Sequence, residues 1–111
     1  TVSNPGGHSS APRKDNAIYE LADALQKIEA YTFPVSYSPM TLASLKAAGE
    51  QTPGELGAAM VAFAANPADE AAIAALRADP STVGSIGTTC IATMLRAGHA
   101  ENALPQRATA T

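Results

Sequence analysis

The sequence has few charged and few aromatic residues. Charged residues make up 15% of the chain and aromatic residues 5%, with no tryptophan at all, whereas charged residues usually account for about 25% of a globular domain. A surface with so little charge is tolerated best when a partner covers part of it, so the composition favours assembly with a protein partner. The formal net charge of −3 disfavours nucleic acid and anionic membranes as partners.

Cysteine and long apolar runs are also scarce. Cys90 is the single cysteine, so an intrachain disulfide is excluded and the compartment stays open. No apolar run approaches the roughly 20 residues that a membrane-spanning helix needs. A start at Thr1 is equally compatible with loss of an initiating methionine, of a leader or of a longer preceding segment.

Alanine takes the place of the missing residue types, and alanine is the best helix former. Residues 1–14 and 99–111 have no apolar period and predict extended tails, either flexible or docked on a partner. Residues 15–98 predict a helical domain. The expected fold class is therefore all-α: a compact array of about five short helices with proline and glycine joints.

Local signals place the five expected helices. Asp15 or Asn16 caps the first, which runs to Ala30, and the second covers residues 41–48 before Gly49. The remaining three begin near Thr52, Asn66 and Asp79, each of which is a capping residue followed by proline. The last of them extends to Gly98. The apolar positions expected to be buried are Ile18, Leu21, Leu25, Ile28, Leu42, Leu45, Leu56, Met60, Phe63, Ile73, Leu76, Ile86, Cys90, Ile91 and Met94.

No group of residues predicts a catalytic, cofactor or metal site. Cys90 lies on an expected apolar stripe, and the two histidines, His8 and His99, lie in the expected tails, so a buried small hydrophobe is favoured over a nucleophile. Asp69 and Glu70 suit a helix N-terminus without any metal. Residues 84–89 lack the following lysine of a phosphate-binding loop. The methionines, Met40, Met60 and Met94, are expected in the core and not on a haem.

One segment resembles a known family. Residues 47–56 (AAGEQTPGEL) resemble the helix-turn-helix of winged-helix regulators such as the MarR family, and residues 80–83 and 96–98 look like the two ends of a recognition helix. The resemblance implies DNA binding. However, residues 81–95 contain no lysine or arginine to contact phosphates, and no wing hairpin follows Gly98.

Three functions remain open. The favoured one is a structural or interaction subunit of a larger assembly, such as a virion component, a scaffold or a small subunit of a complex, without enzymatic activity and self-associating or bound to another protein. The first alternative is a DNA-binding regulator. The second is a helical protein with a small-ligand pocket near Tyr31, Phe33 and Tyr37, on a connector restricted by Pro34 and Pro39.

Overall fold

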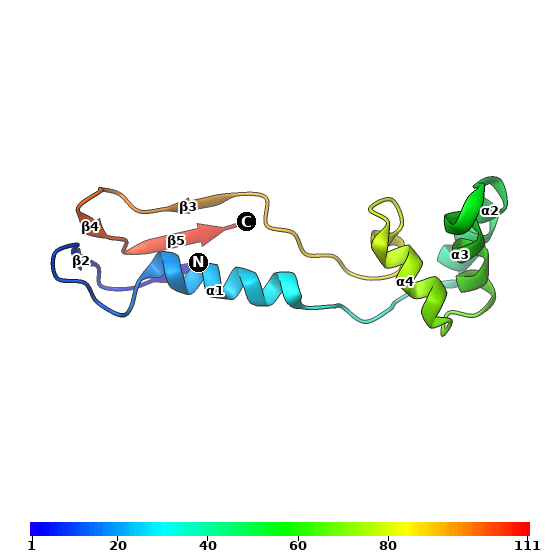
Figure 1. The fold of residues 1–111 in the computed structure, drawn as a ribbon, viewed down its shortest axis with the longest axis horizontal. Coiled ribbons are helices and arrows are strands. Elements are labelled where there is room, and N and C mark those ends of the chain that lie inside the picture. Colours follow the sequence, from blue (N-terminus) through cyan, green and yellow to red (C-terminus); the bar gives the residue numbers. More distant parts are fainter. The chain divides into compact units, whose positions relative to one another are not determined.

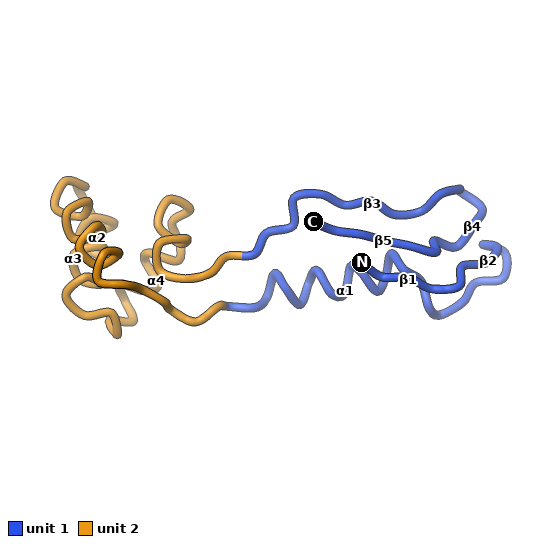
Figure 2. The backbone as a smooth tube through the Cα atoms, turned by 180° about the vertical axis from the view of Figure 1, so that it is seen from behind, with its two compact units in different colours: residues 1–32, 90–111 blue, residues 33–89 orange.

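The chain folds into two units in the computed structural model, which describes residues 1–111. Unit 1 combines Thr1–Thr32 with Cys90–Thr111, and unit 2 is the segment Phe33–Thr89 between them (Figure 2). Unit 1 is thus built from both ends of the chain, and unit 2 is a continuous insertion in it.

Unit 1 consists of one helix and five short strands (Figure 1). The elements are β1 (Val2–Ser3), β2 (Gly7–His8), α1 (Ala17–Ala30), β3 (Leu95–Ala97), β4 (Ala103–Leu104) and β5 (Arg107–Ala110). The strands form a three-stranded antiparallel sheet of order β1-β5-β3 and a two-stranded antiparallel pair of β2 with β4. Both terminal segments are therefore parts of sheets, and the expected tails are wrong.

Helix α1 packs on the three-stranded sheet through small side chains. Asn16 caps the helix, as predicted, because its side-chain oxygen accepts hydrogen bonds from the backbone N–H groups of Ile18 and Tyr19. Ala17, Leu21 and Ala108 of β5 form the buried core of this unit. Ala17 and Ala108 are completely buried, so the helix lies close to the sheet with no room for a larger residue.

Unit 2 is helical, with α2 (Pro39–Gln51), α3 (Gly54–Ala65), α4 (Glu70–Ala78) and a short 3-10 helix at Val83–Ser85. Ser38 caps α2 with Pro39 at its first position, and Asp69 caps α4. The core of the unit consists of Leu45, Ala59, Met60, Phe63, Ala72, Leu76 and Ile86. Helices α2 and α3 meet at Gly49 and Gly57, where a Cβ atom added to Gly57 would lie 2.8 Å from the backbone oxygen of Gly49.

The all-α expectation is wrong, because the structure combines four α-helices with five short strands in two antiparallel sheets, and the fifth expected helix is absent. Residues 79–98 form no α-helix. Asp79 accepts a hydrogen bond from the backbone N–H of Ser81 in a turn, a short 3-10 helix follows, and the chain is then extended up to β3. This segment is rich in threonine and isoleucine, which favour strands. Its apolar spacing fits a helix, but β3 gains its backbone hydrogen bonds from β5.

The burial of individual residues agrees with the prediction at some positions and differs from it at others. Of the residues expected in the core, Leu21, Leu45, Met60, Phe63, Leu76 and Ile86 are buried, as predicted. The largest departures are Cys90, Ile91 and Met94, which are exposed because the helix that would have buried them does not form. Ile18 and Ile28 of α1 are partly exposed as well.

Two starts of helices also differ from expectation. Thr52 ends α2 and its hydroxyl donates to the backbone oxygen of Ala48, so it does not cap α3. Helix α4 begins at Glu70 behind Asp69, because Asn66 instead accepts from the backbone N–H of Ala68 in a turn. Gly49 lies inside α2 and is buried by α3, which is why it is glycine.

The close approach of α2 and α3 makes a prediction about Gly57. Replacement of Gly57 by alanine places a methyl group against the backbone oxygen atoms of Thr52 and Gly49, and overpacking of this kind typically costs about 1–3 kcal/mol. Gly84→Ala is the matched control, since nothing lies within 4 Å of a Cβ atom at Gly84. Urea unfolding should show a clear loss of stability for Gly57→Ala alone. Equal effects of the two changes would contradict the packing described.

Candidate self-association surface

The sheet of unit 1 has a strand that is paired on one side only. In the order β1-β5-β3, strand β3 lies at an edge and pairs only with β5. The register places Leu95 opposite Ala110, Arg96 opposite Thr109 and Ala97 opposite Ala108. The other side of β3 therefore presents backbone groups without a strand partner, which is an arrangement that can accept a further strand.

One face of β3 is apolar and stays uncovered. Ala108 and Ala110 face α1, because both pack in the core formed with Ala17 and Leu21. Residues directly opposite each other in a sheet share a face, so Leu95 and Ala97 lie on this same face. Helix α1 contacts β1 and β5, and Leu95 remains 60% exposed. The helix thus covers two strands of three and leaves the apolar face of the third in solvent.

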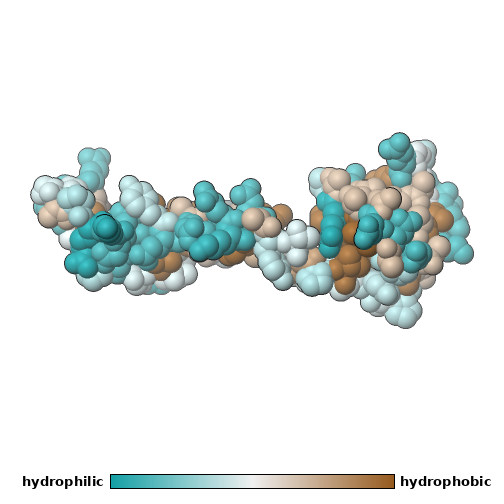
Figure 3. Space-filling view, turned by 60° about the horizontal axis from the view of Figure 1, so that its bottom comes forward, coloured by the Kyte–Doolittle hydropathy of each residue, from teal (hydrophilic) through white to brown (hydrophobic).

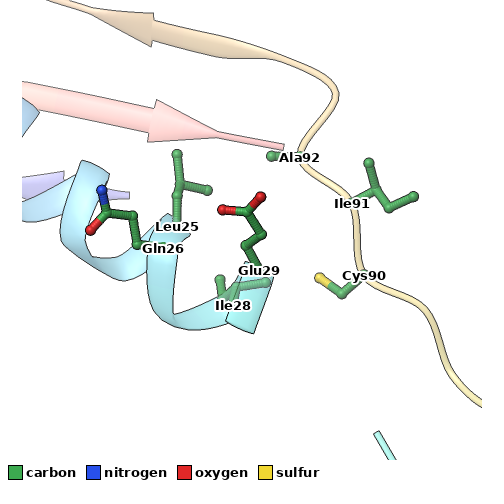
Figure 4. Close-up of a pocket in the computed structure, with 7 residues that line it drawn as sticks. All are labelled: Leu25, Gln26, Ile28, Glu29, Cys90, Ile91 and Ala92. Carbon is green, nitrogen blue, oxygen red and sulfur yellow. The ribbon is translucent and has the colours of Figure 1, made fainter. Parts of the chain in front are cut away.

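A second exposed apolar area lies at the end of α1, beside the segment that leads into β3. An open pocket of about 510 Å³ lies between Leu25, Gln26, Ile28 and Glu29 of the helix and Cys90, Ile91 and Ala92 of the segment before β3 (Figure 4). Ile28 is 43% exposed and Ile91 is 76% exposed. We call Ile28, Ile91 and Leu95 the apolar edge of unit 1. Large apolar side chains this exposed, beside a free strand edge, are typical of a surface that another protein covers.

The opposite face of the sheet is polar. Arg96, Arg107 and Thr109 line a shallow pocket there, and the hydroxyl groups of Thr1 and Thr109 lie 3.3 Å apart. The outer face of α1 is polar too, with an ion pair of 2.6 Å between Lys27 and Asp23. Figure 3 shows a largely hydrophilic surface on the face of unit 1 that it draws. The apolar edge is therefore bordered by charged and hydroxyl-bearing faces.

The β2-β4 pair carries the one histidine that has defined hydrogen bonds. His8 lies in β2 opposite Ala103. Its Nδ1 atom accepts from the backbone N–H of Ser10 at 3.1 Å and lies 2.7 Å from the Ser10 hydroxyl. Gly6 and Gly7 before it both have positive φ, and a Cβ atom at Gly6 would meet the Gln106 side chain and the backbone oxygen of Leu104. The chain reaches this pairing only because these positions are glycine.

The residues considered as candidates for chemistry are not brought together. Cys90 lies in the extended segment of unit 1, and no hydrogen bond joins it to His8 or to His99. No three side chains of histidine, cysteine, aspartate and glutamate form a group suited to a metal ion. Residues 84–89 form no helix N-terminus, since Gly87 pairs with Val35 instead.

The structure also places Tyr37 of the connector and the three methionines, which were candidates for a ligand pocket and for a haem site. Tyr37 packs edge-on against Phe63 with ring centroids 6.0 Å apart, so it supports the core of unit 2. Met60 is buried, while Met40 and Met94 are exposed. No helix of the structure is both long enough and apolar enough to cross a membrane.

A two-layer α/β unit with an open sheet edge is the class of domain that this geometry defines. The family model of the peptidase dimerisation domain, found in M20 peptidases, matches residues 1–111, and the chain belongs to this family. Comparisons with curated proteins and with solved structures give no match.

Family membership corrects the function expected from the sequence. Membership of the peptidase dimerisation domain family supports a role in dimerisation, so the expected virion component, scaffold or other structural subunit is wrong, and so are the DNA-binding and small-ligand alternatives. The helix-turn-helix resemblance is limited to the consecutive helices α2 and α3, because no recognition helix follows. The expected self-association is confirmed. The family context is enzymatic, so the expectation that the chain has no enzymatic activity is not confirmed.

Sequence reasoning missed the apolar edge, although a signal was present. Ile91 is expected to be buried on a helix, but the threonines at positions 88, 89 and 93 favour an extended chain. Reading the segment as a strand would have left it without a local pairing partner. Its partner, β5, is only four residues long and has the sequence RATA.

The ion pair beside α1 gives a prediction about proton binding. Arg13 donates from Nε and Nη2 to the two carboxylate oxygens of Asp15, at 2.8 and 2.9 Å, and these hydrogen bonds lower the pKa of Asp15. In an NMR titration the Asp15 carboxyl should titrate below the usual aspartate range, and Arg13→Gln should move its midpoint upward. Because the folded pKa is the lower one, the small stabilisation is present at neutral pH and is lost as the pH falls through that pKa. An unchanged midpoint in Arg13→Gln would contradict this assignment.

Proposed function

We propose that the apolar edge of unit 1, together with the free side of β3, is the surface through which two copies of this peptidase domain associate. The observation that carries the proposal is the exposure of Leu95 and Ile91 beside a strand that has only one neighbour. A second copy supplies the same surface, and a two-fold arrangement allows each copy to cover the apolar edge of the other.

The backbone and the side chains of this edge favour the same kind of partner. A strand from the second copy would satisfy the outward N–H and C=O groups of β3, and its Leu95 would enter the apolar area beside Ile28 and Ile91. Removing these side chains from water favours association at roughly 25 cal/mol per Å² of apolar area, before the entropy of association is subtracted. The polar faces on either side would remain in solvent.

The charge of unit 1 supports its association with a copy of itself. It contains five acidic residues (Asp15, Glu20, Asp23, Glu29 and Glu101) and five basic residues (Arg13, Lys14, Lys27, Arg96 and Arg107). With no net charge, two copies of unit 1 meet without long-range repulsion. We further propose that the contribution of these residues to the peptidase is assembly, and that the hydrolytic chemistry is carried out by other residues of the enzyme.

A lysine at position 95 tests the proposed surface. Leu95→Lys places a charge in the apolar edge, and burying it in a dimer interface is unfavourable, so we expect the dimer dissociation constant to rise by about tenfold or more. Analytical ultracentrifugation over a concentration series measures this directly. Circular dichroism should show that the helix content is unchanged, because Leu95 is largely exposed in the single chain.

Tyr19→Lys provides the matched control for this experiment. Tyr19 is also a large exposed side chain, at 72%, but it lies on the face of α1 turned away from Ala17 and Leu21, outside the apolar edge. It should leave the dissociation constant unchanged. If Tyr19→Lys weakens the dimer and Leu95→Lys does not, the interface lies on α1 and the proposed surface is wrong.

A further inference from the structure

The insertion Phe33–Thr89 has a complete hydrophobic core of its own. Phe63, Leu76 and Ile86 are its largest fully buried side chains, and each belongs to a different part of the segment. The core of unit 1 is made of Ala17, Leu21 and Ala108. The two cores have no residue in common, so the burial that stabilises one unit is built from different side chains than the burial that stabilises the other.

The two ends of the insertion are joined within unit 2 itself. Val35 and Gly87 form an antiparallel bridge, and the backbone N–H of Ser36 donates to the backbone oxygen of Ile86 at 2.9 Å. Arg77 of α4 donates from Nη2 to the backbone oxygen of Phe33 at 2.8 Å. The chain therefore enters and leaves unit 2 at one neck, and the bridge and hydrogen bonds named here join residues of unit 2 to one another.

Residues of unit 2 itself provide the hydrogen bonds at the C-terminal end of α4. The buried hydroxyl of Thr82 donates to the backbone oxygen of Leu76 at 2.7 Å, which satisfies a carbonyl group in the last turn of the helix. Asp79 accepts from the backbone N–H and the hydroxyl of Ser81, and these hydrogen bonds lower the pKa of Asp79. The turn that leads from α4 back to the neck is thus held by its own side chains.

The two units also differ in net charge. Unit 2 contains five acidic residues (Glu50, Glu55, Asp69, Glu70 and Asp79) and two basic ones (Lys46 and Arg77). It therefore carries the whole net charge of −3, whereas unit 1 is neutral. Like charges on two copies of unit 2 repel each other, which opposes association through the insertion.

We propose that unit 2 is a separate cooperative module. It unfolds and refolds while unit 1 stays folded and the dimer stays intact. The crossings at Thr32–Phe33 and Thr89–Cys90 then act as joints between two bodies that fold independently. Such an insertion lets one part of a peptidase's dimerisation domain change between an ordered and a disordered state while the two subunits stay associated. Persistence of the dimer rests on the proposed association through unit 1, whereas the separate folding of unit 2 does not.

Hydrogen exchange of the whole chain, with one cavity-forming change in each core, tests this module. Phe63→Ala empties part of the unit 2 core and should raise exchange of the α2, α3 and α4 amides by about tenfold or more, with exchange in α1 and β5 changed less than about twofold. Leu21→Ala should have the reverse effect. If either change speeds exchange in both units to a similar extent, the chain is a single cooperative body and the proposal is wrong.

A milder pair of variants keeps the test decisive where a large cavity abolishes folding. Leu76→Val and Leu21→Val remove one methylene group from each core, and the same separation of exchange should appear with smaller factors. Sedimentation of Phe63→Ala gives the second readout, and its dimer dissociation constant should equal that of the unchanged chain. A weakened dimer would show that unit 2 supports the interface. Failure of the Leu95→Lys experiment would leave the separation of exchange intact, so the two proposals fail independently.

Discussion

The fold of unit 1 depends on one strand, β5, which contacts both other strands of its sheet and helix α1. It pairs with β1 on one side and with β3 on the other, and its Ala108 is completely buried against α1. Val2 and Ala108 pair across nearly the whole chain, so this contact closes a loop that includes the entire insertion. Loop closure costs entropy, but the cost grows only slowly with length. An insertion of the size of unit 2 is therefore compatible with the pairing.

This dependence explains which parts of the fold could be predicted from the sequence. Helix α1, its Asn16 cap and the buried Leu21 follow from local spacing and local hydrogen bonds, and so do the helices of unit 2 with Phe63 and Leu76 in their core. The strands have no comparable local signal. They are two to four residues long. Residues 107–111 do alternate between polar residues and alanine, but alanine is depleted in strands and is the best helix former, so this alternation is a weak signal.

The segment before β3, which was predicted to be helical, shows that local sequence signals are also insufficient at the candidate site. Residues 83–95 fit a helical apolar stripe, yet six of these thirteen residues are β-branched, and the tertiary partner decides between the two structures. Once β5 pairs with residues 95–97, Ile91 and Leu95 cannot reach the helical core that the spacing implied, and they become exposed. Low charge did indicate that a partner covers part of the surface. Composition did not indicate where, because that location depends on a pairing between distant residues.

The small residues that made the chain look helical serve close packing in both units. Ala17 and Ala108 bring α1 against the sheet, and Gly49 and Gly57 bring α2 against α3. A helix held this close to a sheet by small side chains covers mainly the strands directly beneath it. In unit 1 the consequence is that α1 protects β1 and β5 and leaves β3 open. A free strand edge with exposed leucine and isoleucine promotes aggregation in a protein that must remain monomeric. In a domain whose family serves dimerisation, the same thin packing leaves apolar surface available for a second copy.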